Sequence, residues 1–368
     1  MGDCRRGSSR RASAACLRSA EGRYIDRTFL AALAAAALTA AAVVAPNKAK
    51  ADEGGVGLWV PGFFGSLAAT PQVPGFSYAS IFVHESLSAG SDVAFARQVT
   101  RGRITANFTA GLNIALNGRA DLYLAAPSYT FAQPLLGGQA NVALAIPYGR
   151  SFASVDGTLT AAIGPVGFTV GGSASDAVTG FGDLAPMFSL RWNRGVNNYM
   201  VYVTGNVPVG RYDPDRLANL GIGHNALDAG AGYTYFDPNS GNEFSAVLGF
   251  TYNFENTHTQ YQNGIDMHLD WGLSHFFTKQ LQLGAVGYGY QQISCDSGAG
   301  NRLGCFETRV LGIGPQLGYI IPMGKLQGYL NLKAYKDVDA EHRASGWSGW
   351  VTFAISPAAG PEPPPSIP

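Results

Sequence analysis

The sequence predicts an all-β fold, namely a closed antiparallel β-barrel that spans a membrane. Three observations lead to this fold class. Long segments alternate apolar and polar residues with a period of two, which is typical of strands with one face in lipid. The connections between these segments alternate between short and long. After Asp52 the chain has no run of 18 apolar residues, so transmembrane helices are not expected.

The alternation is clearest in the second half of the chain. Several segments keep it for 11 to 13 residues, whereas a soluble strand usually has about 5–6. A tilted transmembrane strand needs about 9–11 residues, so these lengths favour a membrane barrel over a soluble sandwich. One segment has apolar residues at every second position from 244 to 254, and the next at Ile265, Met267, Leu269, Trp271 and Leu273.

We expect about fourteen strands, and an even number places both chain termini on the periplasmic side. The region 151–180 is the weakest part of the pattern because Gly164-Pro165 interrupts it, so twelve strands is kept as an alternative. An open sheet edge in lipid would leave backbone groups unpaired, so the sheet should close. The candidate strands are 76–87, 104–116, 119–131, 139–148, 152–170, 181–192, 199–208, 224–236, 242–254, 264–276, 280–292, 306–321, 326–336 and 346–355.

The connections predict which end of the barrel faces outward. Asn117-Gly118 is the strongest hairpin signal, since both residues tolerate positive φ. Short turns on the periplasmic side and longer outer loops are typical of outer-membrane barrels. The other short connections are 237–241, 277–279 and 322–325, and the long ones are 209–223, 256–263, 294–305 and 337–345.

The first 51 residues have the features of a secretory signal peptide. Arg23 and Arg27 precede an apolar run over 29–44, and Ala49-Lys50-Ala51 offers a small-x-small cleavage site. A membrane anchor would need about 20 apolar residues, which is longer than this run. We therefore expect 1–51 to be cleaved on export to the outer membrane. The long Arg-rich stretch before Arg23 leaves a downstream translation start open.

Charge and cysteine content narrow the function classes. Residues 52–368 carry 22 acidic and 16 basic residues and no basic cluster, so a nucleic-acid partner is not expected. Cys4 and Cys16 leave with the signal peptide. Cys295 and Cys305 flank a Gly/Ser/Asn loop, which predicts a disulfide in an exported chain. No metal or cofactor is expected, because no His or Cys lies at ligand spacing.

A set of short motifs extends over almost the whole exported chain. The motifs include PGFFGSLAA at 61–69, GDLAP at 182–186, NLG at 219–221, TYFD at 234–237, GFTYNFEN at 249–256 and GIGPQ at 312–316. Together they resemble the MetA-pathway phenol-degradation family of outer-membrane proteins, from about residue 54 to 353. The resemblance implies a transporter-like barrel linked to uptake of aromatic or other hydrophobic compounds, without naming a substrate.

If the apolar faces meet lipid, two neighbouring strands direct a polar cluster into the lumen. One interpretation is a ring that orients a ligand's hydroxyl or amine. The other is the ordinary polar lining of a barrel, whose carboxylates bond their neighbours. The cluster consists of Asn253, Glu255, Asp266, His268 and Asp270.

The segment 52–75, ahead of the barrel at 76–355, is apolar and interrupted by prolines. The prolines disfavour a central strand. Two interpretations stay open: a plug inside the lumen that lines a route for apolar cargo, or a periplasmic lead-in packed on the rim. The candidate aromatic residues are Trp59, Phe63, Phe64 and Phe76. After the barrel, 356–368 is expected to be a disordered tail, since it contains six prolines.

The sequence therefore favours a channel or transporter for small hydrophobic or aromatic compounds, connected to their catabolism. Its expected partners are the outer-membrane bilayer and a small apolar ligand. A structural or receptor-type barrel is the alternative. An enzyme is not expected, because the chain has no Gly-x-Ser-x-Gly elbow and no His-Glu-x-x-His motif, although a barrel-borne hydrolase needs only a spatial cluster. Cargo, direction of transport and oligomeric state do not follow from the sequence.

Overall fold

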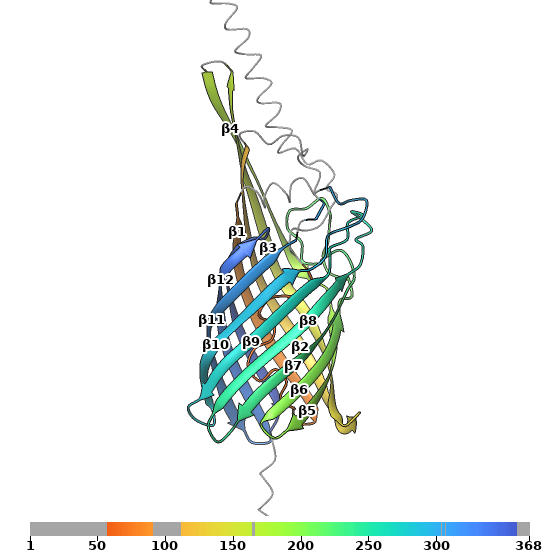
Figure 1. The fold of residues 1–368 in the computed structure, drawn as a ribbon, viewed down its shortest axis with the longest axis vertical. Helices are drawn as coiled ribbons and strands as arrows, with labels where there is room; N and C mark the ends of the chain where they lie inside the picture. Colours follow the sequence, from red (N-terminus) through yellow and green to blue (C-terminus); the bar gives the residue numbers. More distant parts are fainter. Residues whose placement is uncertain (1–56, 91–111, 164–165, 303, 306, 359–368) are drawn as a thin grey trace, which may run out of the picture.

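The computed structural model describes residues 57–90, 112–163, 166–302, 304–305 and 307–358 (Figure 1). These residues form one antiparallel sheet of 13 strands. The strands are β1 (Gly75–Ala89), β2 (Leu112–Leu135), β3 (Gly138–Ile163), β4 (Val166–Phe181), β5 (Ala185–Arg194), β6 (Asn197–Gly205), β7 (Ala226–Asp237), β8 (Asn242–Asn253), β9 (Asp266–Phe276), β10 (Leu281–Gln292), β11 (Arg309–Met323), β12 (Leu326–Glu341) and β13 (Ser345–Pro357).

The sheet closes on itself, as the sequence predicts. Its order is β2-β1-β13-β12-β11-β10-β9-β8-β7-β6-β5-β3-β4, and β2 also pairs with β3. β4 takes no separate place in the wall, because β3 pairs with β5 through 139–145 and with β4 through 148–163. β4 and β5 thus pair with the same edge of β3, one beyond the other along its length. The barrel has twelve strand positions and one extra strand, so the expected count of fourteen is too high.

The miscount has its origin in β2 and β3. The predicted hairpin at Asn117-Gly118 is wrong, because both residues lie within β2 and pair with Ser154 and Ala153 of β3. The real turn is Leu136-Gly137, where both residues have the positive φ that a two-residue hairpin needs. β3 likewise runs without a break through 149–151. Residues 104–111, part of a predicted strand, lie outside the described residues.

The two ends of the barrel differ as predicted. Short turns join β2 to β3, β5 to β6, β7 to β8, β9 to β10 and β11 to β12 at the lower end in Figure 1. The longer connections 206–225, 254–265 and 293–308 gather at the upper end, where the β3–β4 hairpin also extends beyond the rim. The predicted long loop at 337–345 is wrong: β12 continues to Glu341, so only 342–344 connect it to β13.

The outer surface carries the apolar face of the alternation. In β8, Phe244, Leu248 and Phe250 are exposed, while the intervening Glu243 and Ser245 are buried. Exposed aromatic residues lie towards both ends of the barrel. Outer-membrane barrels carry such aromatic girdles at the level of the lipid headgroups on both sides of the membrane. The exposed aromatic residues include Phe82, Tyr123, Tyr148 and Phe181 towards the upper end and Phe76, Tyr129, Tyr199 and Phe277 towards the lower end. No helix in the described part of the chain is long and apolar enough to cross a membrane.

Candidate lumen site

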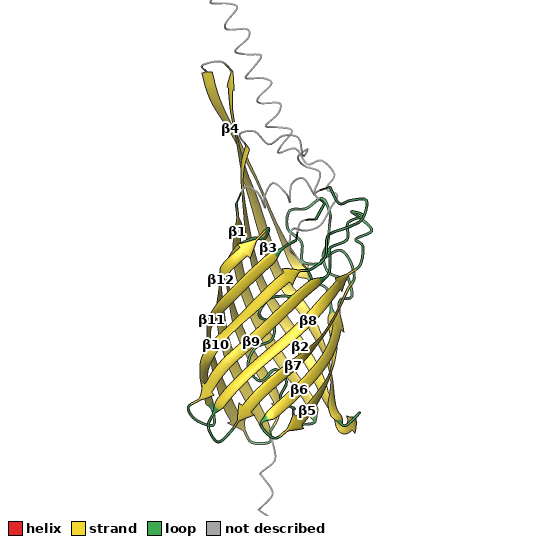
Figure 2. Cartoon of the chain, viewed as in Figure 1, coloured by secondary structure: helices red, strands yellow, loops and turns green. Residues whose placement is uncertain are grey.

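The residues ahead of β1 run through the interior of the barrel. Residues 57–74 make two tight turns, and the loop is visible between the strands in Figures 1 and 2. Trp59 is 6% exposed and Ala69 is fully buried. We call residues 57–74 the lumen segment. Its backbone bonds inward-facing side chains of the wall, and these bonds define the candidate site.

A carboxylate and an ammonium group hold the first turn of the lumen segment. Asp270 on β9 accepts bonds from the backbone N–H groups of Gly62 and Phe64, each at 3.0 Å. From β12, Lys333 Nζ donates to the carbonyl oxygens of Gly62 at 2.6 Å and Phe64 at 3.3 Å. Hydrogen bonds to charged groups contribute about 1.5–3 kcal/mol each, so this turn is firmly attached.

Two glycines allow this close approach. Gly62 has a φ of +85°, and a Cβ added there would lie 2.8 Å from the ring of Tyr335. On the wall, a Cβ added to Gly272 of β9 would lie 2.8 Å from the backbone nitrogen of Ser66. A side chain at either position would displace the lumen segment.

A second set of bonds holds the other turn. Glu243 on β8 accepts a bond from the backbone N–H of Leu67 at 2.9 Å, and Thr234 Oγ1 on β7 accepts one from Ala69 at 3.0 Å. The other oxygen of Glu243 accepts a bond from Ser274 at 2.6 Å. Ser245 Oγ also donates to the oxygen that Leu67 bonds, so wall residues hold the carboxylate of Glu243 in position for the segment.

Four of the five predicted lumen residues lie on the inner face. Asn253, Asp266, His268 and Asp270 are each at most 3% exposed. Asn253 Nδ2 donates to Asp266 Oδ2 at 2.8 Å. Glu255 does not belong to the group: β8 ends at Asn253, so the alternation no longer applies, and Glu255 is exposed.

His268 connects the polar wall to an aromatic residue of the lumen segment. Its Nε2 lies 2.8 Å from Asp228 Oδ2 on β7 and 3.5 Å from the hydroxyl of Tyr202 on β6. The Trp59 ring stacks on the imidazole with centroids 3.7 Å apart and an interplanar angle of 12°. Thr251 donates to the same Asp228 oxygen at 2.6 Å. Trp59 is thus positioned by a fully buried hydrogen-bonded group.

A group of apolar side chains lines another part of the lumen. Trp59, Phe63 and Phe64 pack there against inward-facing side chains of β1, β2 and β10–β13. Phe76, predicted to share this path, is 63% exposed on the outer surface near the start of β1. The apolar group on the wall consists of Val83, Leu124, Val286, Tyr288, Tyr290, Val310, Tyr335 and Trp350.

Several wall residues that bond the lumen segment, or that bond His268 beside it, are absent from the sequence prediction. Asp228 and Glu243 are inward-facing on β7 and β8 and could have been found by applying the alternation to every strand. Lys333 lies between the exposed Leu332 and Ala334 of β12, so the same test would place it inside. Arg191, whose Nε lies 3.4 Å from the carbonyl oxygen of Ala68, sits near the end of β5 where the alternation is short.

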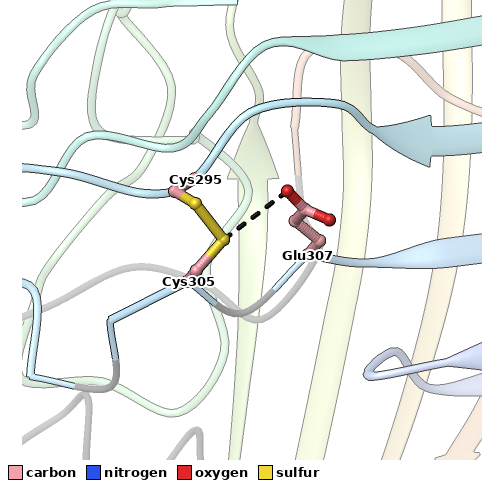
Figure 3. Close-up of side chains that lie close together, drawn as sticks. All are labelled: Cys295, Cys305 and Glu307. Atoms are coloured by element: carbon pink, nitrogen blue, oxygen red, sulfur yellow. Dashed lines mark hydrogen bonds between the residues drawn. A yellow bond between two sulfur atoms is a disulfide. The ribbon is translucent and has the colours of Figure 1, made fainter.

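The outer loops at the upper end are joined by a disulfide and by backbone hydrogen bonds. Cys295 and Cys305 form the predicted disulfide, with Glu307 Oε1 3.5 Å from the Cys305 sulfur (Figure 3). Because both sulfur atoms are in the disulfide, Cys295, Cys305 and Glu307 together offer no thiolate ligand to a metal ion. Gln262 and Ser297 exchange two backbone hydrogen bonds, which join the loop 254–265 to the loop 293–308.

These features define an outer-membrane β-barrel with an occupied lumen. The chain belongs to the family described as "Putative MetA-pathway of phenol degradation", whose model matches residues 102–353. This confirms the family that the motifs indicate. No curated protein matches the chain.

The chain is also similar to solved structures. An outer membrane channel from Pseudomonas putida F1 is 11% identical, with a TM-score of 0.57 over 78% of this chain and 97% of that chain. A FadL homologue from Pseudomonas aeruginosa is 10% identical, with a TM-score of 0.34 over 77% of this chain and 89% of that one. The first likeness confirms the closed outer-membrane barrel as the fold class.

Proposed function

We propose that the barrel passes small hydrophobic or aromatic compounds through its lumen. One observation carries this proposal: an apolar group of wall residues lies inside the barrel, where Trp59, Phe63 and Phe64 cover it. The interior of a water-filled porin is polar, so an apolar inner wall favours apolar cargo. Burial of apolar surface contributes about 25 cal/mol of favourable free energy per Å², so contact with this inner wall stabilises apolar cargo in the lumen.

The lumen segment acts as a plug in this proposal. Its backbone is attached to the wall through Glu243 on β8, Asp270 on β9 and Lys333 on β12, while its aromatic side chains cover the apolar group of wall residues. A compound that enters the lumen along this apolar group competes with these aromatic side chains for the same surface. The segment must therefore shift, at least in part, for cargo to pass.

The relatives support the proposal in general terms. The family's description refers to phenol degradation, and the similar structure from Pseudomonas putida F1 is named an outer membrane channel. For this chain, a connection to catabolism of aromatic compounds follows as part of the proposal. So does export through a cleaved signal peptide at 1–51, which lies outside the described residues.

Uptake by intact cells tests the proposal. A strain without this barrel would be compared with the same strain carrying the gene, using toluene as an apolar probe and arabinose as a hydrophilic one. The expected result is a several-fold faster initial uptake of toluene with little change for arabinose. Equal toluene rates, with the folded barrel present in the outer membrane, would overturn the proposal.

A further inference from the structure

The outer wall of β1–β4 carries a row of four exposed aromatic side chains. Phe82 of β1 pairs with Tyr123 of β2, Tyr123 with Tyr148 of β3, and Tyr148 with Phe181 of β4. Directly paired residues in an antiparallel sheet point to the same face. The four side chains are 40–58% exposed, so they form a continuous aromatic row. In an outer-membrane barrel such a row marks the edge of the lipid.

A polar row follows two residues further towards the loop end on the same face. His84 pairs with Asp121, Asp121 with Arg150, and Arg150 with Thr179. These residues alternate in phase with the aromatic row and therefore also point outward. The row lies just beyond the lipid edge, at the level of the lipid headgroups.

Two arginine side chains lie at this polar row. Arg119, on β2 two residues beyond Asp121, donates from Nε to Asp121 Oδ2 at 3.1 Å. Arg150 belongs to the row itself and is exposed. Within the part of the chain that the structure describes, the guanidinium of Arg150 donates no hydrogen bond.

Positive groups outnumber the carboxylate in this polar row. Among the described residues of the row, the guanidinium groups of Arg119 and Arg150 and the imidazole of His84 lie beside one carboxylate, Asp121, which His84 contacts at 2.6 Å and Arg119 at 3.1 Å. Asp121 therefore already bonds His84 and Arg119. The remaining guanidinium N–H groups of Arg119 and Arg150 point to an anionic partner outside the chain.

We propose that Arg119 and Arg150 bind the phosphate groups of a phosphorylated glycolipid, the lipid A part of lipopolysaccharide in the outer leaflet. Guanidinium groups bind phosphate with two parallel hydrogen bonds, which suits this pair of arginines. The aromatic row directly below contacts the upper part of the acyl chains. The site therefore continues the lipid-facing surface of the barrel and depends only on its outer-membrane location, not on the cargo.

Native mass spectrometry of the detergent-solubilised full barrel with diphosphoryl lipid A tests this site. The variant is Arg119→Gln/Arg150→Gln. A matched control, Arg194→Gln/Lys279→Gln, removes two exposed positive charges at the short-turn end. Binding should weaken about tenfold or more in the first variant, because charge-assisted bonds to phosphate are lost, and stay unchanged in the control.

Dephosphorylated lipid A separates the phosphate contacts from the aromatic ones. The unsubstituted barrel should bind it as weakly as the arginine variant binds the diphosphoryl lipid. Heat-dependent migration on gels would verify that both variants are folded. Equal binding of diphosphoryl lipid A by the arginine variant, or equal binding of the two lipids by the unsubstituted barrel, would overturn the proposal.

Discussion

At the scale of single residues, Asp270 is a carboxylate that is buried inside the lumen. It is 1% exposed, and its two oxygens each accept one backbone bond from the lumen segment. A buried carboxylate is costly unless such bonds satisfy it. Asp270 is thus stable inside the barrel because Gly62 and Phe64 bond it, and the segment stays in place for the same reason.

Replacing Asp270 with Asn should loosen the lumen segment. An amide has one acceptor oxygen, so one of the two N–H groups, that of Gly62 or that of Phe64, loses its partner. An unsatisfied buried donor costs about 1–3 kcal/mol, so amide exchange at Gly62 and Phe64 should become about tenfold faster or more. Hydrogen exchange followed by mass spectrometry of residues 57–74 measures this effect.

The matched control is Glu255→Gln. It makes the same chemical change at an exposed carboxylate that follows β8. Exchange in the lumen segment should not respond to it. If Asp270→Asn left the exchange of this segment as slow as in the unsubstituted barrel, Asp270 would not hold it.

Residue positions were predictable only where the alternation is regular. It places Asn253, Asp266, His268 and Asp270 inside, and all four side chains are buried in the structure. It fails at Glu255 because β8 ends two residues earlier. The stacking of Trp59 on His268 joins residues more than 200 positions apart, and no local pattern contains that information.

At the scale of elements, the strands were predictable and their boundaries less so. β6 to β11 lie close to their expected ranges because each contains one uninterrupted alternation. β2 and β3 are much longer, with 24 and 26 residues, and contain turn-forming residues that remain extended. Asn117-Gly118 stays in β2 because pairing with β1 and β3 on both sides outweighs its turn preference.

The role of the lumen segment can be tested directly by deleting it. Deleting residues 54–72 removes the side chains and backbone that occupy the lumen while leaving β1 complete. The single-channel conductance of the deletion variant in a planar bilayer should rise, because ions gain a water-filled path. A folded deletion variant with unchanged conductance would show that this segment does not close the pore.

At the scale of the whole molecule, the inner wall is uneven around the barrel. The side formed by β7–β9 bonds the lumen segment through Thr234, Glu243 and Asp270, while β1, β2 and β10–β13 carry an apolar group together with Lys333, which also bonds the segment. The sequence predicts a closed barrel but not this arrangement, since it depends on which strands become neighbours on closure. The apolar group gives cargo a surface to pass along once the lumen segment shifts.

A designed disulfide between the lumen segment and the wall tests this account most directly. Ser66 Oγ and Ser274 Oγ are 3.4 Å apart, so cysteines at both positions should be able to join. Toluene uptake by cells carrying Ser66→Cys/Ser274→Cys would be measured before and after reduction. The single variant Ser66→Cys and the unsubstituted barrel, treated in the same way, control for the native Cys295–Cys305 disulfide. We expect uptake to be lost in the oxidised double variant and restored by reductant, whereas full uptake with the cross-link formed would contradict a lumen route past a movable segment.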